Sequence, residues 1–388
     1  MAADPARGVL IRRRAIRGAL SNAVGQVIGL VALFVLTPYI LARIGASGYG
    51  LWVLVGSLAA YGGLLDLGIG SAVVKYVAEH RARRDADASR ALIATALRLY
   101  LALGALAFVL SLGVAAVFPD LFVAPADRQT ASLLVVLTGL NLGISIAAAP
   151  TTSVLVGIQR FDLYNVVGAG STLLWAATTV VALAAGAGVV GMVALNVPIT
   201  LLMRVLSLRF IRQAAPDLPF GYAGASRAAA ATVFGYSASI FASQISDLLQ
   251  KKTDEIVVAA AIAVSAVTPY AIGRRLSEIT HVLTNQFVRV LLPIASELYA
   301  TNDRERLVTL YLVSTRVTIT LFASIGLPIV LLAGQILTVW VGPGFEDAVP
   351  VIGILTAASF LLTSVWPAGS VLQGMARFRL VAISSVAS

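Results

Sequence analysis

The sequence has no cysteine, little histidine and little charge. None of its 388 residues is cysteine, and only His80 and His281 are histidines. Disulfides, thiolate metal sites and cysteine nucleophiles are therefore excluded, and a histidine metal centre has few ligands to draw on. Charged residues make up 12% of the chain, against about a quarter in a soluble globular protein. So little charge on so long a chain excludes a soluble enzyme, a disordered chain and a fibrous protein.

Hydrophobic residues, by contrast, make up 59% of the chain, and the mean hydropathy is +0.92. A helix needs about 20 apolar residues to cross a hydrocarbon core of about 30 Å. Apolar runs of that length predict spans near 18–42, 49–78, 91–117, 130–156, 164–186, 189–210, 229–263, 268–297, 308–333 and 346–371, with an eleventh starting near 380. We therefore predict an all-α integral membrane protein with about 10–11 transmembrane helices.

The net charge is +10, from 28 basic and 18 acidic residues. In a soluble chain this would suggest nucleic acid, but in a membrane chain it reflects the bias of basic residues toward the cytoplasmic loops. The arginine-rich residues 1–17 resemble the start of a signal peptide, but the apolar run behind them is too long, so we predict an uncleaved first helix. With residues 1–17 in the cytoplasm, only Arg43 and Arg128 fall on the outside, and no nucleic-acid partner is expected.

An internal repeat divides the chain. Residues 150–163 match residues 367–380 at eight positions with an offset of 217, where chance predicts about one or two. Both segments join an inward-going helix to an outward-going one, so the repeat is parallel. The predicted parts are a basic cytoplasmic tail (1–17), an N-lobe of six helices (18–212), a cytoplasmic linker (213–228) and a C-lobe (229–388). By the offset the C-lobe lacks the rest of its eleventh helix and a twelfth, so we expect a truncated second lobe.

The expected seventh helix, 229–263, carries five charged residues, which are Asp247, Lys251, Lys252, Asp254 and Glu255. Facing lipid, each would cost about 2.5–3.5 kcal/mol at the bilayer centre. At about 100° per residue, four of them share one face with Gln244, and Lys252 lies beside that face. They must meet water or one another. The alternative is that 250–255 forms an outside loop between two shorter helices.

The expected eighth helix, 268–297, repeats this pattern. One face carries Tyr270, Arg274, Glu278, His281, Asn285 and Arg289, and Arg275 flanks it. With Arg275 included, the stripe has a net charge of +2 (three arginines and one glutamate), and it runs almost the full depth of the membrane, which indicates a hydrated cavity. The alternative is a set of ion pairs between helices with no part in transport. The first repeat is less charged, and Asp66 near the middle of the second helix either faces a cavity or caps or pairs locally.

Four segments, 45–82, 253–279, 290–300 and 339–355, resemble bacterial polysaccharide exporters and O-antigen flippases. That family belongs to the superfamily of multidrug, oligosaccharidyl-lipid and polysaccharide exporters. The resemblance implies two six-helix lobes around a central cavity that opens to alternate sides. It also implies a protein of the bacterial inner membrane that moves an undecaprenyl-diphosphate-linked oligosaccharide outward, for lipopolysaccharide O-antigen or a similar surface glycan. A polysaccharide polymerase and chain-length proteins are the expected partners.

On this hypothesis the stripes form the binding site. The cations Arg274, Arg275, Arg289, Lys251 and Lys252 bind the diphosphate, since arginine matches phosphate oxygens in pairs. Asn285, Gln244 and Tyr270 bond sugar hydroxyls. The acidic residues Asp247, Asp254, Glu255, Glu278 and Asp66 balance the cations, and one of them binds Na⁺ or H⁺. His281 either titrates or makes a structural hydrogen bond. No other cofactor and no metal is expected.

Three other functions fit the sequence less well. A small-molecule exporter on the same fold would favour an acidic, aromatic cavity for organic cations, whereas the stripe of 268–297 is net basic. A scaffold of a glycan-assembly complex would not need two long polar stripes. An enzyme is not expected, because the sequence holds no Walker loop or zinc-protease motif and its loops are short.

Overall fold

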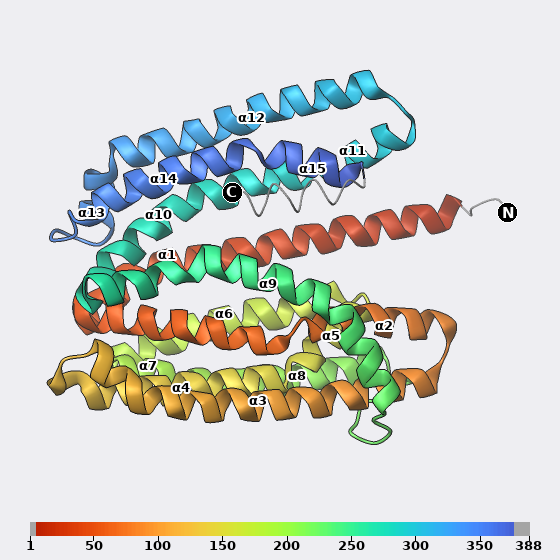
Figure 1. Ribbon diagram of the computed structural model, residues 1–388, viewed down its shortest axis with the longest axis horizontal. Coiled ribbons are helices and arrows are strands. Elements are labelled where there is room, and N and C mark those ends of the chain that lie inside the picture. The colour runs from red at the N-terminus through yellow and green to blue at the C-terminus, as the bar shows by residue number, and fades with distance from the viewer. Residues whose placement is uncertain (1–4, 376–388) are drawn as a thin grey trace. The chain divides into compact units, whose positions relative to one another are not determined.

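The computed structural model describes residues 5–375, and within this range it consists of helices joined by short loops, with no strand (Figure 1). Side chains are described except at 5–24, 126, 238–239, 242–243, 246–247, 249–252 and 289. The expected start of an eleventh helix near 380 lies outside the described residues. The prediction of an all-α chain is confirmed.

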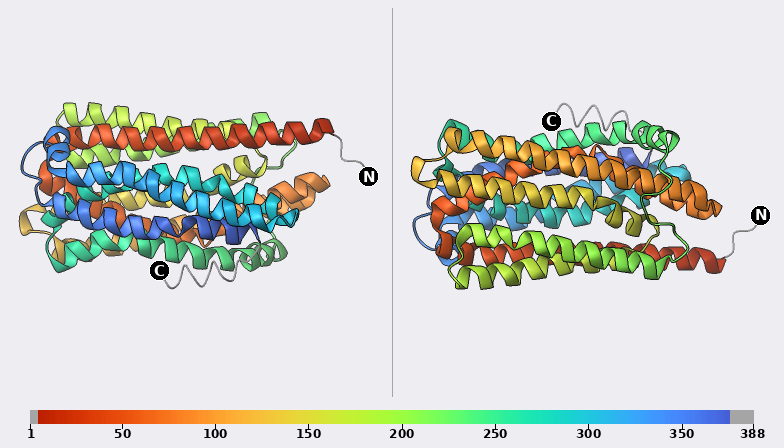
Figure 2. Two further views of the ribbon diagram at one scale, coloured as in Figure 1. Left: turned by 90° about the horizontal axis from the view of Figure 1, so that it is seen from above. Right: turned by 90° about the horizontal axis from the view of Figure 1, so that it is seen from below.

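The chain divides into two compact units, Met1–Val267 and Thr268–Ser388. Unit 1 contains α1 (Pro5–Gly62), η1 (Gly63–Asp66), α2 (Ile69–Arg83), α3 (Ala86–Phe122), η2 (Pro125–Asp127), α4 (Arg128–Ala147), α5 (Ala149–Gly157), α6 (Phe161–Ala184), α7 (Gly188–Ala194), α8 (Asn196–Ala214) and α9 (Arg227–Ala261). α10 (Val264–Arg289) continues into unit 2, which also holds α11 (Leu291–Ala300), α12 (Arg304–Leu331), α13 (Ala333–Trp340), α14 (Ala348–Ser364) and α15 (Trp366–Gly374). Within each unit the long helices lie side by side along one direction (Figure 2).

Seven helical stretches of the described residues are long and apolar enough to cross a membrane. α9 and α10 are also of spanning length, at 35 and 26 residues, but carry the charged stripes. Large apolar side chains on the outward faces, such as Val109, Leu202 and Val205, are more than half exposed, as lipid-facing residues are. The chain is therefore a multi-pass membrane protein.

The internal repeat is visible in the helix boundaries. Adding 217 to the bounds of α5 gives Trp366 and Gly374, which are the bounds of α15, and both short helices begin with a proline in their first turn. Adding 218 to Asp85, the N-cap of α3, gives Asp303, the N-cap of α12. α1 contains a non-helical Gly45 with φ of 71°. Its first limb therefore ends at residue 44, and adding 217 gives Ala261, where α9 ends.

The expected second helix, 49–78, is broken in the middle, which its apolar run does not predict. The second limb of α1 ends at Gly62, η1 follows as a 3₁₀ turn, and α2 begins at Ile69. Leu67 and Gly68 between them are left-handed, with φ of 51° and 74°. Adjacent glycines at 62 and 63 weaken the helix here, and Gly68 adopts the left-handed conformation without a Cβ clash. The equivalent residues 279–285 lie inside the continuous α10, so the break distinguishes the two repeats.

Candidate functional site

The charged stripe of α9 lies on a continuous helix. α9 runs unbroken from Arg227 to Ala261, so the alternative of a loop at 250–255 is wrong. Glu255 is buried and Asp254 is half-buried. Gln244 is also half-buried, and its buried Oε1 has no hydrogen-bond partner among the described residues. The side chains of Asp247, Lys251 and Lys252 lie outside the described residues.

One hydrogen bond fixes the charged segment of α9 within unit 1. Thr253, between the lysines and the acidic pair, shares a hydrogen bond of 2.7 Å with the hydroxyl of Tyr61 on the second limb of α1. Tyr61 lies directly before the break in the helix, at Gly62. The charged part of α9 is therefore held against the break between the second limb of α1 and α2.

α10 presents two distinct faces. The first face is buried in unit 2, where Ile272, Leu276, Thr280 and Thr284 recur every four residues and are at most 2% exposed. The second carries the predicted stripe, in which Tyr270, Arg274, His281 and Asn285 are half-buried and Glu278 is exposed. At about 100° per residue the two faces lie roughly 140° apart. The stripe therefore turns away from the packed interior of unit 2. Arg275 flanks it and is half-buried, and the Arg289 side chain lies outside the described residues.

Contacts with α14 and α15 fix α10 within unit 2. The Thr356 hydroxyl donates to that of Ser277 over 3.1 Å. The rings of His281 and Trp366 form a T-shaped contact, with 4.4 Å between centroids and an interplanar angle of 89°. Trp366 is the first residue of α15, so this contact links the stripe to the repeated short helix.

Asp66 lies at the break between η1 and α2. Its carboxyl accepts a hydrogen bond from the hydroxyl of Tyr100, a fully buried residue of α3. A Cβ built on Gly70 would lie 3.2 Å from that hydroxyl and 3.3 Å from the Ser153 hydroxyl, so three helices bring polar groups together here. A short distance along α2, the Lys75 ammonium lies 4.6 Å and 4.4 Å from the ring centroids of Tyr76 and Tyr236.

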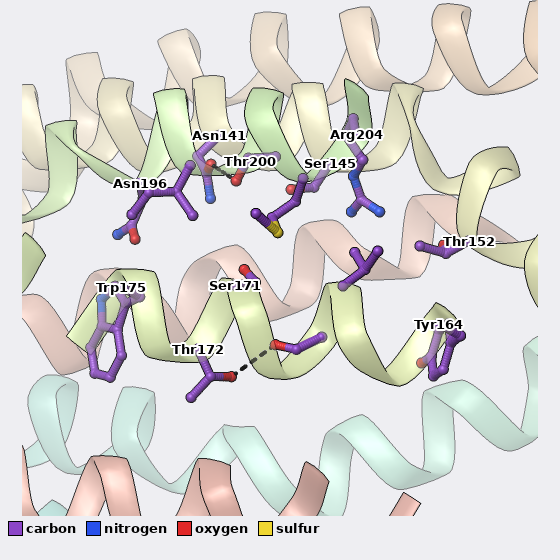
Figure 3. A pocket seen from close by; sticks show the side chains of 14 residues that line it. Asn141, Ser145, Thr152, Tyr164, Ser171, Thr172, Trp175, Asn196, Thr200 and Arg204 are labelled. Carbon is purple, nitrogen blue, oxygen red and sulfur yellow. Dashed lines mark hydrogen bonds between the residues drawn. The ribbon is translucent and has the colours of Figure 1, made fainter. Parts of the chain in front are cut away.

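A polar cavity of about 510 Å³, absent from the sequence-based predictions, lies inside unit 1 (Figure 3). It is lined by α4, α5, α6 and α8, and on one wall Thr200 of α8 donates a 2.7 Å hydrogen bond to Asn141 of α4 (Figure 3). Figure 3 shows Arg204 directed into the space between α8 and α6, with Ser171 and Trp175 on the opposite wall. The full lining is Asn141, Ser145, Thr152, Tyr164, Val167, Gly168, Ser171, Thr172, Trp175, Asn196, Ile199, Thr200, Met203 and Arg204.

Arg204 is the one charged residue in that lining. Its Nε is buried without a hydrogen-bond partner, and no carboxylate among the described residues forms an ion pair with it. It lies ten residues before the end of α8, which corresponds to a depth of about 15 Å. The bias of basic residues toward cytoplasmic loops accounts for Arg209 and Arg212 nearer the helix end, but not for Arg204.

A sequence signal for this cavity exists. Asn196, Thr200 and Arg204 follow one another at intervals of four on α8, so they share one face. On α6, Ser171 and Trp175 have the same spacing. Polar residues repeated in this way within an apolar span indicate a face that meets neither lipid nor a dry core.

The described chain thus defines an all-α, multi-pass membrane protein with internal repeats, broken helices and polar surfaces at membrane depth. It belongs to a family described as polysaccharide biosynthesis protein, whose model matches residues 40–350. No curated protein sequence matches the chain.

Solved structures of membrane transporters share the fold. An inward-facing multidrug resistance MATE family transporter of the MOP superfamily aligns with a TM-score of 0.69 and 16% identity, over 95% of this chain and 83% of the other. The MATE multidrug transporter DinF-BH gives 0.64 and 16%, over 97% and 85%. A MOP superfamily transporter from Pyrococcus furiosus, described as having a binding pocket of reverse polarity, gives 0.60 and 17%, over 95% and 84%. All three are described as transporters rather than as enzymes.

Proposed function

We propose that this protein is an alternating-access flippase that moves an undecaprenyl-diphosphate-linked oligosaccharide from the inner to the outer leaflet of the bacterial inner membrane. Membership of a polysaccharide biosynthesis family supports a glycan as the substrate. The fold supports transport as the activity. The observation that carries the proposal is the face of α10 with Tyr270, Arg274, His281 and Asn285, which is turned away from the packed interior of its own unit. Polar and cationic groups on such a face at membrane depth meet water, a polar substrate or one another.

The substrate has three parts with different requirements. Its polyprenyl tail stays in lipid, its diphosphate carries negative charge, and its sugar chain is bulky and polar. Arg274 and Arg275 bind the diphosphate, together with Arg289, Lys251 and Lys252, because a guanidinium pairs with two phosphate oxygens and stays charged when partly desolvated. Asn285, Gln244 and Tyr270 bond the sugar hydroxyls.

Acidic residues stabilise the site between substrates. Asp254, Glu255 and Glu278, together with Asp247, balance the cations when no diphosphate is bound. One of these, or Asp66 at the helix break, binds Na⁺ or H⁺ and couples export to the ion gradient. His281, on the α10 stripe, belongs to the same proposed coupling group. The N-terminus lies in the cytoplasm, and the exported glycan passes to a polymerase and chain-length proteins.

Complementation tests this function. The chain and its variants are expressed in a bacterium that lacks its own O-antigen flippase, and surface glycan is measured along with the amount of inserted protein. Arg274→Ala and Arg275→Ala should abolish surface glycan, whereas Arg212→Ala, an exposed arginine at the end of α8, should leave it unchanged. Normal glycan display by both stripe variants would contradict the assignment.

A second candidate, export of small organic molecules, is favoured by the fold alone, since two of the similar structures are those of multidrug transporters. The net-basic stripe argues against organic cations as substrates. The complementation strain decides between the two functions. If the native chain inserts and displays no glycan but lowers the accumulation of a fluorescent dye, the multidrug function replaces the flippase.

A further inference from the structure

The cavity inside unit 1 contains a cation that has no counter-ion among the described residues. Arg204 reaches into it from α8, and its Nε is buried without a hydrogen-bond partner. The lining contains no aspartate or glutamate. A desolvated charge is stable in a protein only when an opposite charge or strong hydrogen bonds compensate it. The cavity therefore has the electrostatic character of an anion site.

The remaining walls offer groups that hydrogen-bond hydroxyls. Asn141 and Thr200 are joined by their 2.7 Å hydrogen bond, which links α4 to α8 on one wall of the cavity. Ser171 and Trp175 line the opposite wall (Figure 3). The ring of Trp175 is also stacked on that of Trp52, with 6.4 Å between centroids and 16° between planes, which fixes its orientation. Amides, hydroxyls and one rigid aromatic ring are the groups that recognise a polyhydroxylated ring.

The volume of the cavity and the opening at one end of it further restrict which ligands can bind. A volume of about 510 Å³ falls within the range of about 300–1,000 Å³ for small-ligand pockets and exceeds what a bare inorganic anion fills. Tyr164, in the first turn of α6, lines one end and is 39% exposed. A ligand can therefore enter from that end of the helix, and Arg204 lies on the same side of the cavity (Figure 3).

We propose that this cavity is a binding site for an acidic sugar, in which Arg204 holds the carboxylate or phosphate and the hydroxyl and amide groups of α4, α6 and α8 hold the ring. Two kinds of ligand have this chemistry: an acidic sugar unit, such as a uronic acid, and a free sugar phosphate. Both combine one anionic group with a hydroxyl-bearing ring. The site is separate from the α10 stripe, and its existence does not depend on flippase activity.

The test is equilibrium binding to the full chain, purified in detergent and measured by isothermal titration. The ligands are glucuronic acid, glucose 1-phosphate, glucose and inorganic phosphate. We expect the two acidic sugars to bind more tightly than glucose or phosphate alone, because only they use both Arg204 and the hydroxyl-binding walls. Tighter binding of glucuronic acid indicates the uronic acid source, and tighter binding of glucose 1-phosphate indicates the sugar phosphate.

Two arginine variants locate the site. Arg204→Gln should weaken binding of the acidic sugars by about 10- to 100-fold, the usual effect of losing a charge-assisted hydrogen bond. Arg209→Gln removes an exposed arginine from the same helix and should leave affinity unchanged. Equal weakening by both variants, or glucose bound as tightly as glucuronic acid by the native chain, would overturn the proposal. The comparison of ligands on the native chain needs no variant, so it holds even if Arg204→Gln does not fold.

Discussion

At the scale of single residues, the pair of Asp66 and Tyr100 links the break in the second transmembrane helix to α3. The Tyr100 hydroxyl, on a fully buried side chain, donates to the carboxyl of the half-buried Asp66. Removing one partner of a buried hydrogen bond leaves the other unsatisfied, at a cost of about 1–3 kcal/mol. We therefore expect Tyr100→Phe to lower the midpoint of thermal unfolding in detergent. Tyr299→Phe, which changes a tyrosine that is 47% exposed, is the control and should leave the midpoint unchanged.

Gly68 supports the same break through its backbone. Its φ is 74°, and a Cβ at this position would lie 2.8 Å from the backbone oxygen of Ser237 on α9. A backbone oxygen cannot swing aside as the end of a side chain can. Gly68→Ala should therefore destabilise the chain by about 1–3 kcal/mol through strain and displacement of α9.

Gly56→Ala is the matched control for Gly68→Ala. A Cβ there meets nothing within 4 Å, and alanine is favoured over glycine in a helix by about 1 kcal/mol. The melting temperatures of the two variants in detergent should therefore move in opposite directions relative to the native chain. A Gly68→Ala protein as stable as the native one would mean that the left-handed turn is dispensable.

At the scale of elements, the sequence predicts the helices well and their interruptions poorly. Long apolar runs and the offset of 217 are properties of whole segments, so the order of helices and the match of α5 with α15 follow from them. The break at Gly62–Gly68 depends on a few backbone angles and on contacts with α9, and an apolar run does not reveal it. α1 likewise begins at Pro5 rather than near residue 18, because hydropathy does not register the arginine-rich first turns of this helix, residues 5–17.

The two faces of α10 lead to a prediction that the composition of the chain makes easy to test. Because the native chain has no cysteine, single cysteines can be introduced without background. Cysteines at Arg274, Glu278 and Asn285 should react with a water-soluble maleimide, since these positions lie on the stripe. Cysteines at Ile272, Leu276 and Thr280, which are buried, should be protected until the protein is unfolded. Equal protection on both faces would mean that the stripe is not hydrated.

At the scale of the whole molecule, the sequence predicts the class of protein and one of its polar surfaces. The stripe of α10 is detectable because six polar residues fall on one face of an apolar span. The unit 1 cavity is harder to detect because its polar residues are divided among four helices, and only the fold brings Asn141, Trp175 and Arg204 around one space. The site inside a unit thus depends on tertiary packing, whereas the stripe depends on a single helix.

The predicted parallel repeat relates the loops of the two halves to the two sides of the membrane. Residues related by an offset of 218 occupy the same place in the two repeats, and in a parallel repeat they lie on the same side. If the basic loops are cytoplasmic, Pro125 and Pro343 both lie outside. Asp87 and Glu305 then both lie on the cytoplasmic side. All four residues are exposed, so a cysteine at each can be labelled without disturbing the packing.

We expect an impermeant maleimide applied to intact cells to label cysteines at Pro125 and Pro343 only, and those at Asp87 and Glu305 to react only after permeabilisation. If the members of a pair react from opposite sides, the repeat is inverted and the equivalence of α5 and α15 has no topological meaning. If both pairs react from the sides opposite to those expected, the repeat stands but the N-terminus lies outside. In that case the basic loops would lie on the outer side of the membrane. They would then face away from the inner leaflet, in which a lipid-linked glycan is made.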